Sequence, residues 1–212
     1  MEVSLMKQRS PEEYRQTLAA ALDEVRALRF TTNNLLLLTK AEADSLALEK
    51  RPVRIDEVLL AALQEARRRY PRQNVELEYS EIPPDENALL IDGNEDLLRN
   101  AFLNLIENAV KYSPEGSLSK VSLGAGGRTV AVRVSDSGSG IAPEDMPRIF
   151  EPFFRSARTQ SIPGSGIGLT LVKAIVERHA GTLEIRSAPD KGTVVQVVLP
   201  LAGSASGVSE AA

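Results

Sequence analysis

Three short polar segments interrupt the apolar second half of this chain of 212 residues, and their order and spacing constrain its fold more than any other feature. They carry, in turn, an amide pair followed by Lys-Tyr, an aspartate followed by two glycines, and a glycine-rich run that opens a predicted helix: Asn104, Asn108, Lys111 and Tyr112; Asp136, Gly138 and Gly140; Gly164, Gly166 and Gly168. Together these groups are the components of a site for Mg²⁺ and the base and phosphates of a nucleotide.

The first segment lies on a predicted helix over residues 94–112. Asn104 and Asn108 are four residues apart and share one helical face, which Lys111 continues beside an apolar stripe. An amide oxygen is a suitable ligand for Mg²⁺, and an ammonium group can meet a phosphate as a point charge. Taken alone, the same spacing also fits the solvent-facing side of an ordinary half-buried helix.

The second segment follows an apolar strand over residues 130–134. The carboxylate of Asp136 could accept a hydrogen bond from the exocyclic amine of adenine, while Gly138 and Gly140 would let the backbone approach the flat base. Guanine presents a carbonyl at that edge, and two buried, unpaired acceptors would cost about 1–3 kcal/mol. The segment therefore favours ATP over GTP, although Asp-Ser-Gly is also ordinary turn chemistry.

The third segment, from Gly164 to Gly168, leads into a predicted helix over residues 167–179. Backbone N–H groups at a helix start bind phosphate. The segment matches neither a Walker loop nor a dinucleotide fingerprint, because it lacks Gly-Lys-Ser/Thr and no strand directly precedes it. Arg155 and Arg158 lie in the preceding loop, where they could clamp the phosphates.

Composition excludes several classes of protein. The chain has no cysteine, which excludes disulfides and thiolate metal sites and fits a reducing compartment. A net charge of −4 argues against nucleic-acid binding. No apolar run approaches the ~20 residues of a membrane span, and no signal peptide follows Met1. We expect a cytoplasmic chain without membrane contact, although a larger parent protein could be bound to the inner membrane.

Residues 1–50 are predicted as a separate helical unit: a stub of one helix in residues 1–10, then a long helix to about Asp44. Ser10, Pro11 and Glu13 form a capping box with proline at the first helical position. Apolar and small side chains recur at spacings of three, four or seven: Leu18, Leu22, Val25, Thr32, Leu36 and Thr39. Because this stripe would be exposed in a monomer, we expect the helix either to pair with another subunit, as in a homodimer, or to have lost a neighbouring helix.

The rest of the chain predicts an α+β two-layer sandwich, with a mixed, mostly antiparallel sheet and helices on one face. We expect this domain over residues 51–201 and a disordered tail over 202–212. A helix over 57–70 would begin at Asp56 and bury Leu59, Leu60, Leu63 and Ala66. Residues 51–55 are predicted as a linker that enters a short strand. The remaining expected elements, besides the helices over 94–112 and 167–179, are strands at 75–79, 88–91, 119–124, 128–135, 181–187 and 193–199, with an irregular segment over 136–165.

In this order the three segments resemble the N, G1 and G2 boxes of the Bergerat-fold ATP-binding domain of sensor histidine kinases. Phe150-Glu-Pro-Phe-Phe-Arg155 resembles the F box, and Thr193 matches a threonine that lies near the adenine in the family. The resemblance covers about residues 53–200. Two departures are visible, because Ser137 replaces the usual asparagine and Pro163 stands where the glycine loop often begins.

The resemblance implies an ATP-dependent protein-histidine kinase with a mobile lid over about residues 143–165. Asn108 would be the Mg²⁺ ligand, while Lys111 and Arg155 would contact phosphates. Asn104 occupies the place of a glutamate base in hydrolytic cousins, so this chain should transfer phosphate and hydrolyse ATP poorly. The remaining implied nucleotide contacts are Tyr112, Asp136, Gly138, Gly140, Ile141, Phe150, Gly164, Gly166, Ile167, Gly168, Leu169 and Thr193.

The family's phosphoacceptor is a histidine on the first helix of a dimerisation hairpin. The single histidine here, His179, lacks the acidic neighbour and following proline of that site, and we interpret it as a surface residue that caps a helix. The long N-terminal helix resembles the second helix of the hairpin. The resemblance therefore implies a chain that binds Mg-ATP without phosphorylating itself, and that serves an acceptor helix and a response regulator supplied separately.

Two alternatives remain open at this stage. A serine kinase of the anti-sigma type shares the fold, but that class has no dimerisation hairpin. A nucleotide-binding regulatory module without transfer activity would keep the binding residues and lose only the chemistry.

Overall fold

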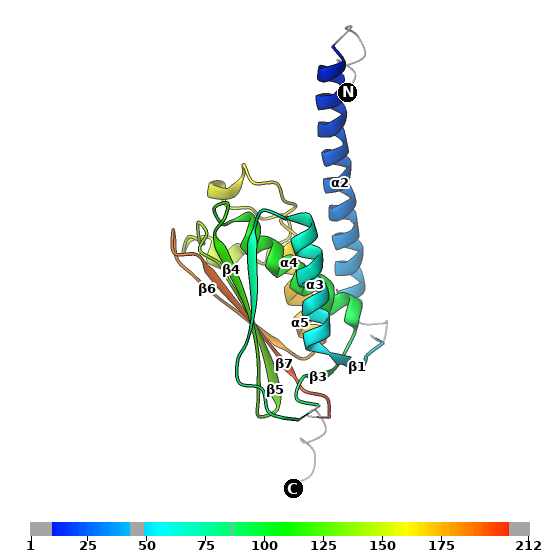
Figure 1. Cartoon of the computed structure of the whole chain (residues 1–212), viewed down its shortest axis with the longest axis vertical. Coiled ribbons are helices and arrows are strands. Elements are labelled where there is room, and N and C mark those ends of the chain that lie inside the picture. The colour runs from blue at the N-terminus through cyan, green and yellow to red at the C-terminus, as the bar shows by residue number, and fades with distance from the viewer. Residues whose placement is uncertain (1–9, 43–48, 86, 204–212) are drawn as a thin grey trace.

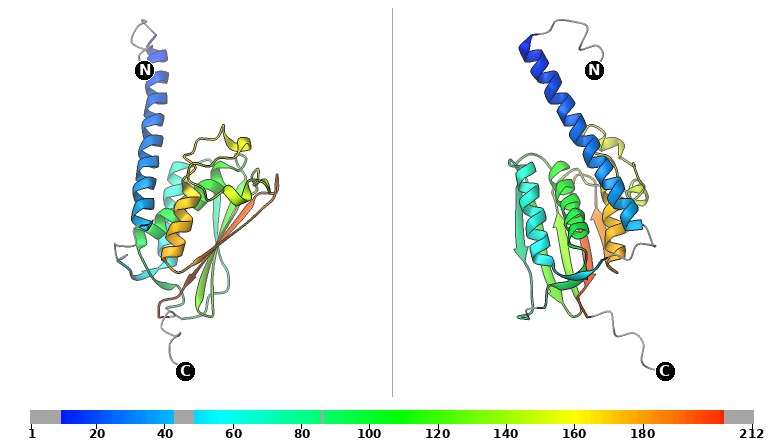
Figure 2. Two further views of the ribbon diagram at one scale, coloured as in Figure 1. Left: turned by 180° about the vertical axis from the view of Figure 1, so that it is seen from behind. Right: turned by 90° about the vertical axis from the view of Figure 1, so that its right-hand side faces the viewer.

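The computed structural model describes residues 10–42, 49–85 and 87–203. A five-stranded sheet forms one layer, in the order β2-β4-β5-β7-β6, and three helices form the other. Figures 1 and 2 show α3 (Ile55–Arg69), α4 (Glu95–Lys111) and α5 (Gly168–Arg178) side by side on the same face of the sheet. The expected α+β sandwich with helices on one face is confirmed.

The sheet is mixed and mostly antiparallel, as predicted. β2 (Asn74–Tyr79) runs parallel to β4 (Leu118–Gly126), whereas β5 (Thr129–Ser135), β7 (Thr193–Pro200) and β6 (Thr182–Ser187) each pair antiparallel with their neighbours. The β4–β5 hairpin turns at Gly127, whose φ of 60° favours glycine. A second, two-stranded sheet pairs β1 (Arg51–Arg54) with β3 (Leu90–Gly93). Strand β3 begins two residues later than the expected strand over 88–91.

Helix α4 begins where its sequence predicts. The side chain of Asn94 accepts a hydrogen bond from the N–H of Leu97, which satisfies one of the free donors of the first turn. The prediction for α3 is partly wrong. Asp56 lies inside the first turn and does not cap the helix, and Leu60 is exposed; Val58 and Ala62 are buried in its place.

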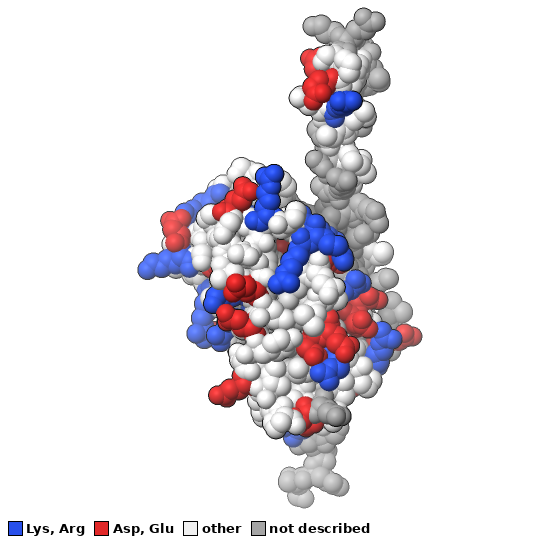
Figure 3. All heavy atoms as spheres, viewed as in Figure 1, with Lys and Arg blue, Asp and Glu red and all other residues white. Residues whose placement is uncertain are grey.

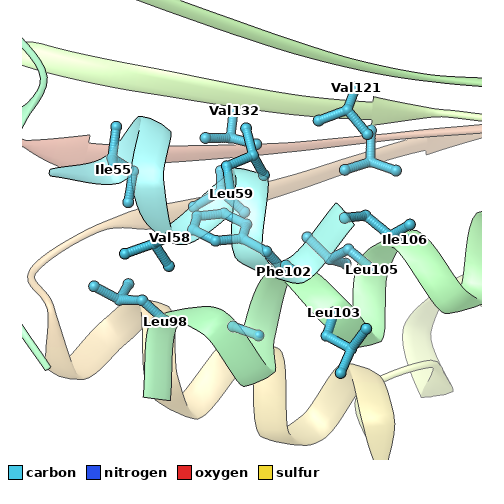
Figure 4. Close-up of a cluster of buried hydrophobic side chains, with 14 of the residues drawn as sticks. Ile55, Val58, Leu59, Leu98, Phe102, Leu103, Leu105, Ile106, Val121 and Val132 are labelled. Carbon is cyan, nitrogen blue, oxygen red and sulfur yellow. The ribbon is translucent and has the colours of Figure 1, made fainter. Parts of the chain in front are cut away.

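The hydrophobic core lies between the helices and the sheet. In Figure 4, side chains of α3 and α4, among them Leu59, Phe102 and Ile106, meet Val121 and Val132 of the sheet. Phe102 is 1% exposed, and at about 25 cal/mol per Å² of apolar surface removed from water such residues supply most of the free energy of folding. The core therefore fixes α4, which carries the first polar segment, against the strand that precedes Asp136.

The long N-terminal helix α2 (Pro11–Glu42) lies against α5 and extends beyond the sandwich (Figure 1). Its capping box is confirmed: Ser10 N–H donates to Glu13 Oε2 at 2.8 Å, and Glu13 N–H donates to Ser10 Oγ at 3.2 Å. Leu18 and Leu36 of the predicted stripe are 68% and 56% exposed. The predicted helix stub and most of the tail lie outside the described residues.

The described residues contain no helix long and apolar enough to cross a membrane. On the face seen in Figure 3, acidic and basic side chains are interspersed, and the view shows no continuous basic stripe.

Candidate nucleotide site

A cavity of about 130 Å³ opens between α4 and the sheet. Val134, Val195 and Ile185 form its floor and are direct neighbours across β5, β7 and β6. Leu105 and Ala109 of α4 form the opposite wall. Two apolar walls with few polar groups at the rim suit a flat ligand such as a nucleotide base.

Asp136 is the carboxylate of this cavity. Its Oδ1 accepts hydrogen bonds from the N–H groups of Gly138 at 2.8 Å and Thr193 at 3.2 Å. Within the described residues, Oδ2 has no hydrogen-bond partner. Burial raises the pKa of the Asp136 carboxyl, against the two backbone hydrogen bonds, which lower it. One oxygen is thus fixed, and the other is left to accept a hydrogen bond from a ligand.

Thr193 is held beside Asp136 by a second set of hydrogen bonds. Its carbonyl accepts from the Asp136 N–H at 2.9 Å, and its hydroxyl lies 2.9 Å from Ser187 Oγ. Ser187 Oγ also accepts from the N–H of Ile141 and donates to the carbonyl of Gly192. These bonds tie the loop after β5 to the β6–β7 hairpin, so the position of Asp136 is set by both.

The glycines of the second segment are required by the protein's own packing. A Cβ on Gly138 would lie 2.3 Å from the carbonyl oxygen of Tyr112, and one on Gly140, whose φ is 63°, would lie 1.9 Å from that of Ala188. The sequence predicts that these glycines allow close approach of the base. The structure shows that they bring the loop against α4 and the β6–β7 hairpin, which is a prior requirement for forming the cavity.

A second cavity, of about 100 Å³, continues from the first. Asn108, Tyr112, Gly166 and Leu169 line both cavities. The second is lined in addition by predicted site residues from α4 and from the glycine-rich segment: Asn104, Lys111, Gly164 and Gly168. The first and third polar segments therefore face one space, as their order in the sequence predicted.

The two asparagines differ in their surroundings. Asn104 is 4% exposed, and its Nδ2 donates to the carbonyl of Asn100 at 2.8 Å. Asn108 is half-buried where the two cavities meet, and its amide has no hydrogen-bond partner among the described residues. No cluster of three His, Cys, Asp or Glu side chains that could hold a metal exists in the part of the chain described. An Asn oxygen with nucleotide phosphates and water is a donor set that suits Mg²⁺.

Lys111 lies at the rim of the second cavity in an ion pair. Its Nζ is 3.2 Å from Glu107 Oε2 and lies 5.9 Å from the centre of the Tyr70 ring. Burial lowers the pKa of Lys111, but Glu107 and Tyr70 raise it by more, so the ammonium stays charged. Glu107, which sequence reasoning missed, is 2% exposed and also pairs with Arg69. Its spacing, four residues before Lys111, could have identified it.

The predicted lid is an irregular segment with two short 3₁₀ turns, at residues 146–148 and 157–159. Arg155 lines the first cavity, and its guanidinium donates to the carbonyls of Thr159, Gln160 and Ile162. Arg158 forms an ion pair of 2.9 Å with Asp190 in the β6–β7 turn. In this structure, therefore, one arginine organises the lid and the other ties it to the sheet.

Three predicted contacts line neither cavity. Gly138 lies behind Asp136, Ile167 is fully buried in the core, and Phe150 lies against α5, where its carbonyl accepts from the Thr170 hydroxyl at 2.9 Å. Ile149 and Phe154 line both cavities instead. Their apolar character was visible in the sequence, but which side of the lid faces the cavity depends on tertiary packing.

The prediction of a surface position for His179 is wrong. The side chain is 2% exposed, its Nε2 accepts from the N–H of Asn94 at 3.0 Å, and its Nδ1 lies 2.7 Å from the carbonyl oxygen of Ile175. These partners fix the neutral tautomer that carries its proton on Nδ1. Burial lowers the pKa of His179, as do the charges of Lys50 and Arg178, against the Ile175 hydrogen bond.

Comparison with known proteins shows the family of the chain. Residues 93–203 match the family described as histidine kinase-, DNA gyrase B- and HSP90-like ATPases. The sensor-like histidine kinase SenX3 of Mycobacterium tuberculosis is 37% identical over 150 residues, which are 70% of this chain and 36% of SenX3. The kinase/phosphatase MprB of Mycolicibacterium vanbaalenii is 36% identical over 94% of this chain and 40% of its own length. The chain thus spans well under half the length of these curated relatives.

Solved structures agree with the sequence matches. A mycobacterial sensor histidine kinase MprB superimposes with a TM-score of 0.62 at 32% identity, covering 72% of this chain and 97% of that one. Full-length ShkA in complex with AMPPNP gives 0.69 at 25% identity, over 92% of this chain and 40% of that one. With the three polar segments gathered around one pair of cavities, the chain belongs to the family of histidine kinase-, DNA gyrase B- and HSP90-like ATPases, as an ATP-binding domain of the sensor histidine kinase type.

Proposed function

We propose that this chain binds Mg-ATP and transfers its γ-phosphate to a histidine on a dimerisation helix outside the described fold. One observation carries the proposal: the Asp136 carboxylate has one oxygen fixed by two backbone N–H groups and the other unpaired in an apolar cavity. A half-buried acceptor in that setting selects a donor at the ligand's edge, as the exocyclic amine of adenine provides.

In this proposal the base lies in the first cavity and the phosphates lie in the second. Tyr112, Thr193 and the backbone from Gly138 to Ile141 surround the base, while Lys111 and the backbone from Gly164 to Leu169 face the phosphates. Mg²⁺ bound through Asn108 would neutralise phosphate charge. Asn104 cannot accept a proton as a base does, so water is not activated and the phosphate is kept for transfer.

The acceptor must come from elsewhere, because the chain's single histidine is buried and both its ring nitrogens are engaged. Residues 1–50, with α2, would be the second helix and adjoining stub of a dimerisation hairpin, and residues 51–201 the catalytic domain. The exposed apolar side chains of α2 would pair with another subunit, and a response regulator would receive the phosphate.

A phosphotransfer assay tests this function. The chain is incubated with γ-labelled ATP and Mg²⁺, alone and with a dimerisation hairpin of a related kinase that carries the acceptor histidine. We expect acid-labile label on the hairpin and none on the chain. The Asn108→Ala variant should lose Mg²⁺-dependent labelling, whereas Asn87→Ala, in the surface loop before β3, should not.

Acid-stable label on a serine would favour a serine kinase instead. Tight ATP binding without transfer to any of several hairpins would favour a regulatory nucleotide-binding module. Acid-labile label on the chain alone would contradict the proposed need for a separate acceptor.

A further inference from the structure

Five charged side chains of alternating sign run from the outer surface of α3 and α4 to the second cavity. Arg99 Nη1 lies 3.8 Å from Glu65 Oε2, and Glu65 also pairs with Arg69. Arg69 Nη1 lies 2.6 Å from Glu107 Oε1, and Glu107 Oε2 lies 3.2 Å from Lys111 Nζ. Of these five residues, only Lys111 lines a cavity.

Glu107 is the unusual member of the row, because its side chain is 3% exposed. Removing a carboxylate from water is costly unless both oxygens are paired. Here each oxygen has a cationic partner, one from α3 and one from α4. The pair with Lys111 alone would leave the rim of the cavity neutral, with a carboxylate facing any incoming phosphate.

The positive charge of Arg69 offsets the negative charge of Glu107. It donates to Glu107 from the last turn of α3, while the charge of Glu65, its other partner, is met in part by Arg99. Lys111, Glu107 and Arg69 together carry a net charge of one positive unit. Hydrogen bonding to Glu107, together with the nearby Tyr70 ring, also restricts the Lys111 ammonium, which lies at the end of a long side chain.

We propose that Glu107 and Arg69 are positioning residues for phosphate binding: Glu107 fixes the Lys111 ammonium at the rim of the second cavity, and Arg69 cancels the charge of the Glu107 carboxylate. The ammonium then keeps its full attraction for phosphate. This inference rests on the proposed function, which places the phosphates in the second cavity. It assigns a role in nucleotide affinity to an arginine that touches neither cavity.

The alternative is that the network only joins α3 to α4. Loss of Arg69 would then loosen α4 as a whole and weaken binding of the base and of the phosphates alike. The balance of charge leads to a different prediction, because it concerns only ligands that carry phosphate. Removing the buried Glu107 charge together with the partly exposed Arg69 charge leaves the net charge beside the phosphates at one positive unit, as in the parent chain.

The experiment measures the affinities of the purified chain for ATP and for adenosine by calorimetry at low salt, with Mg²⁺ present. The variants are Arg69→Gln, the double variant Arg69→Gln/Glu107→Gln, and Arg68→Gln as a matched control that removes an exposed charge one residue away. Glutamine at position 107 can still accept a hydrogen bond from Lys111. Thermal unfolding confirms that each variant is folded.

We expect Arg69→Gln to weaken ATP binding by roughly fivefold or more, with adenosine binding unchanged, and the difference to shrink at high salt. The double variant should bind ATP within about twofold of the parent chain, because its net charge near the phosphates is the same. Arg68→Gln should resemble the parent chain.

Equal losses for ATP and adenosine, or a double variant no better than Arg69→Gln, would overturn the proposal. If the parent chain binds adenosine but gains nothing from the phosphates, this inference fails while the adenine assignment stands. If it binds neither ligand, the proposed function fails as well.

Discussion

At the scale of single residues, Asp136 shows how the fold holds a charge in an unfavourable place. Burial raises the pKa of its carboxyl, so at neutral pH the ionised form is less stable in the folded chain than in the unfolded chain. The hydrogen bonds from Gly138 and Thr193 offset part of this cost on one oxygen only. A perturbed carboxylate in a cavity is typical of a binding site, and a donor on the ligand would stabilise the charge that remains.

His179, in contrast to Asp136, is a structural group that burial keeps neutral. Its Nε2 accepts from the N–H of Asn94, the residue that caps α4, so the end of α5 is joined to the start of the helix that carries the asparagines. Sequence reasoning identified the helix end but not the burial, because Gly93, where an added Cβ would lie 3.0 Å from the His179 ring, comes from a distant part of the chain.

This arrangement predicts an effect of pH on stability. The folded pKa of His179 is lowered, so the unfolded chain binds the extra proton first as the pH falls through the ordinary value of 6.5. The contribution of His179 is complete above that pH and is lost below it. The free energy of unfolding, measured by urea denaturation between about pH 7.5 and pH 5, should therefore decrease more steeply for the parent chain than for His179→Gln. Parallel profiles for the two proteins would contradict this account.

At the scale of elements, the sequence predicted most of what local physics controls. The capping box of Ser10 and Glu13, the Asn94 to Tyr112 helix and the β4–β5 hairpin each depend on neighbours in the chain. The prediction for the inner face of α3 was wrong at Leu60. The adjacent residues Leu59 and Leu60 fit the helical period almost equally well, and only packing against α4 determines which of them is buried. The floor of the first cavity depends on strand register, which no local pattern provides.

The lid, too, was predicted in its local character but not in its contacts. Its irregular composition was predicted, but the partners of Arg155 and Arg158 were not. Arg155 binds carbonyls of the same irregular segment, whose backbone path follows no regular period, and Arg158 binds Asp190, which only tertiary structure brings near. The Arg158–Asp190 pair is partly exposed, and such pairs contribute about 0–1 kcal/mol. It should therefore affect the opening of the lid more than the stability of the whole domain.

Removal of this pair predicts a local effect. In Arg158→Ala we expect faster hydrogen exchange over residues 156–165, with the midpoint of thermal unfolding nearly unchanged. Arg186→Ala serves as the control, because it removes an exposed arginine whose ion-pair partner, Glu184, lies on its own strand and not in the lid. Lid exchange that is unchanged in Arg158→Ala, or equally fast in the control, would show that the pair does not hold the lid.

At the scale of the whole molecule, the site is assembled from parts that are far apart in the sequence. Helix α4 supplies the amides and the ammonium, the ends of β5 and β7 supply Asp136 and Thr193, and the glycine-rich segment closes the second cavity. The core between α3, α4 and the sheet holds these parts in register (Figure 4). The account thus depends on one claim, that the paired cavities bind ATP with its base at Asp136.

The most direct measurement of this claim is a calorimetric titration of Asp136→Asn with ATP and GTP, beside the parent chain and Asp92→Asn, an exposed aspartate on β3. Asparagine can keep the two hydrogen bonds at Oδ1 but presents a donor where the carboxylate accepted. We expect the parent chain and Asp92→Asn to prefer ATP, and Asp136→Asn to lose about tenfold or more in ATP affinity while remaining folded. Unchanged ATP affinity in a folded Asp136→Asn variant would contradict the account.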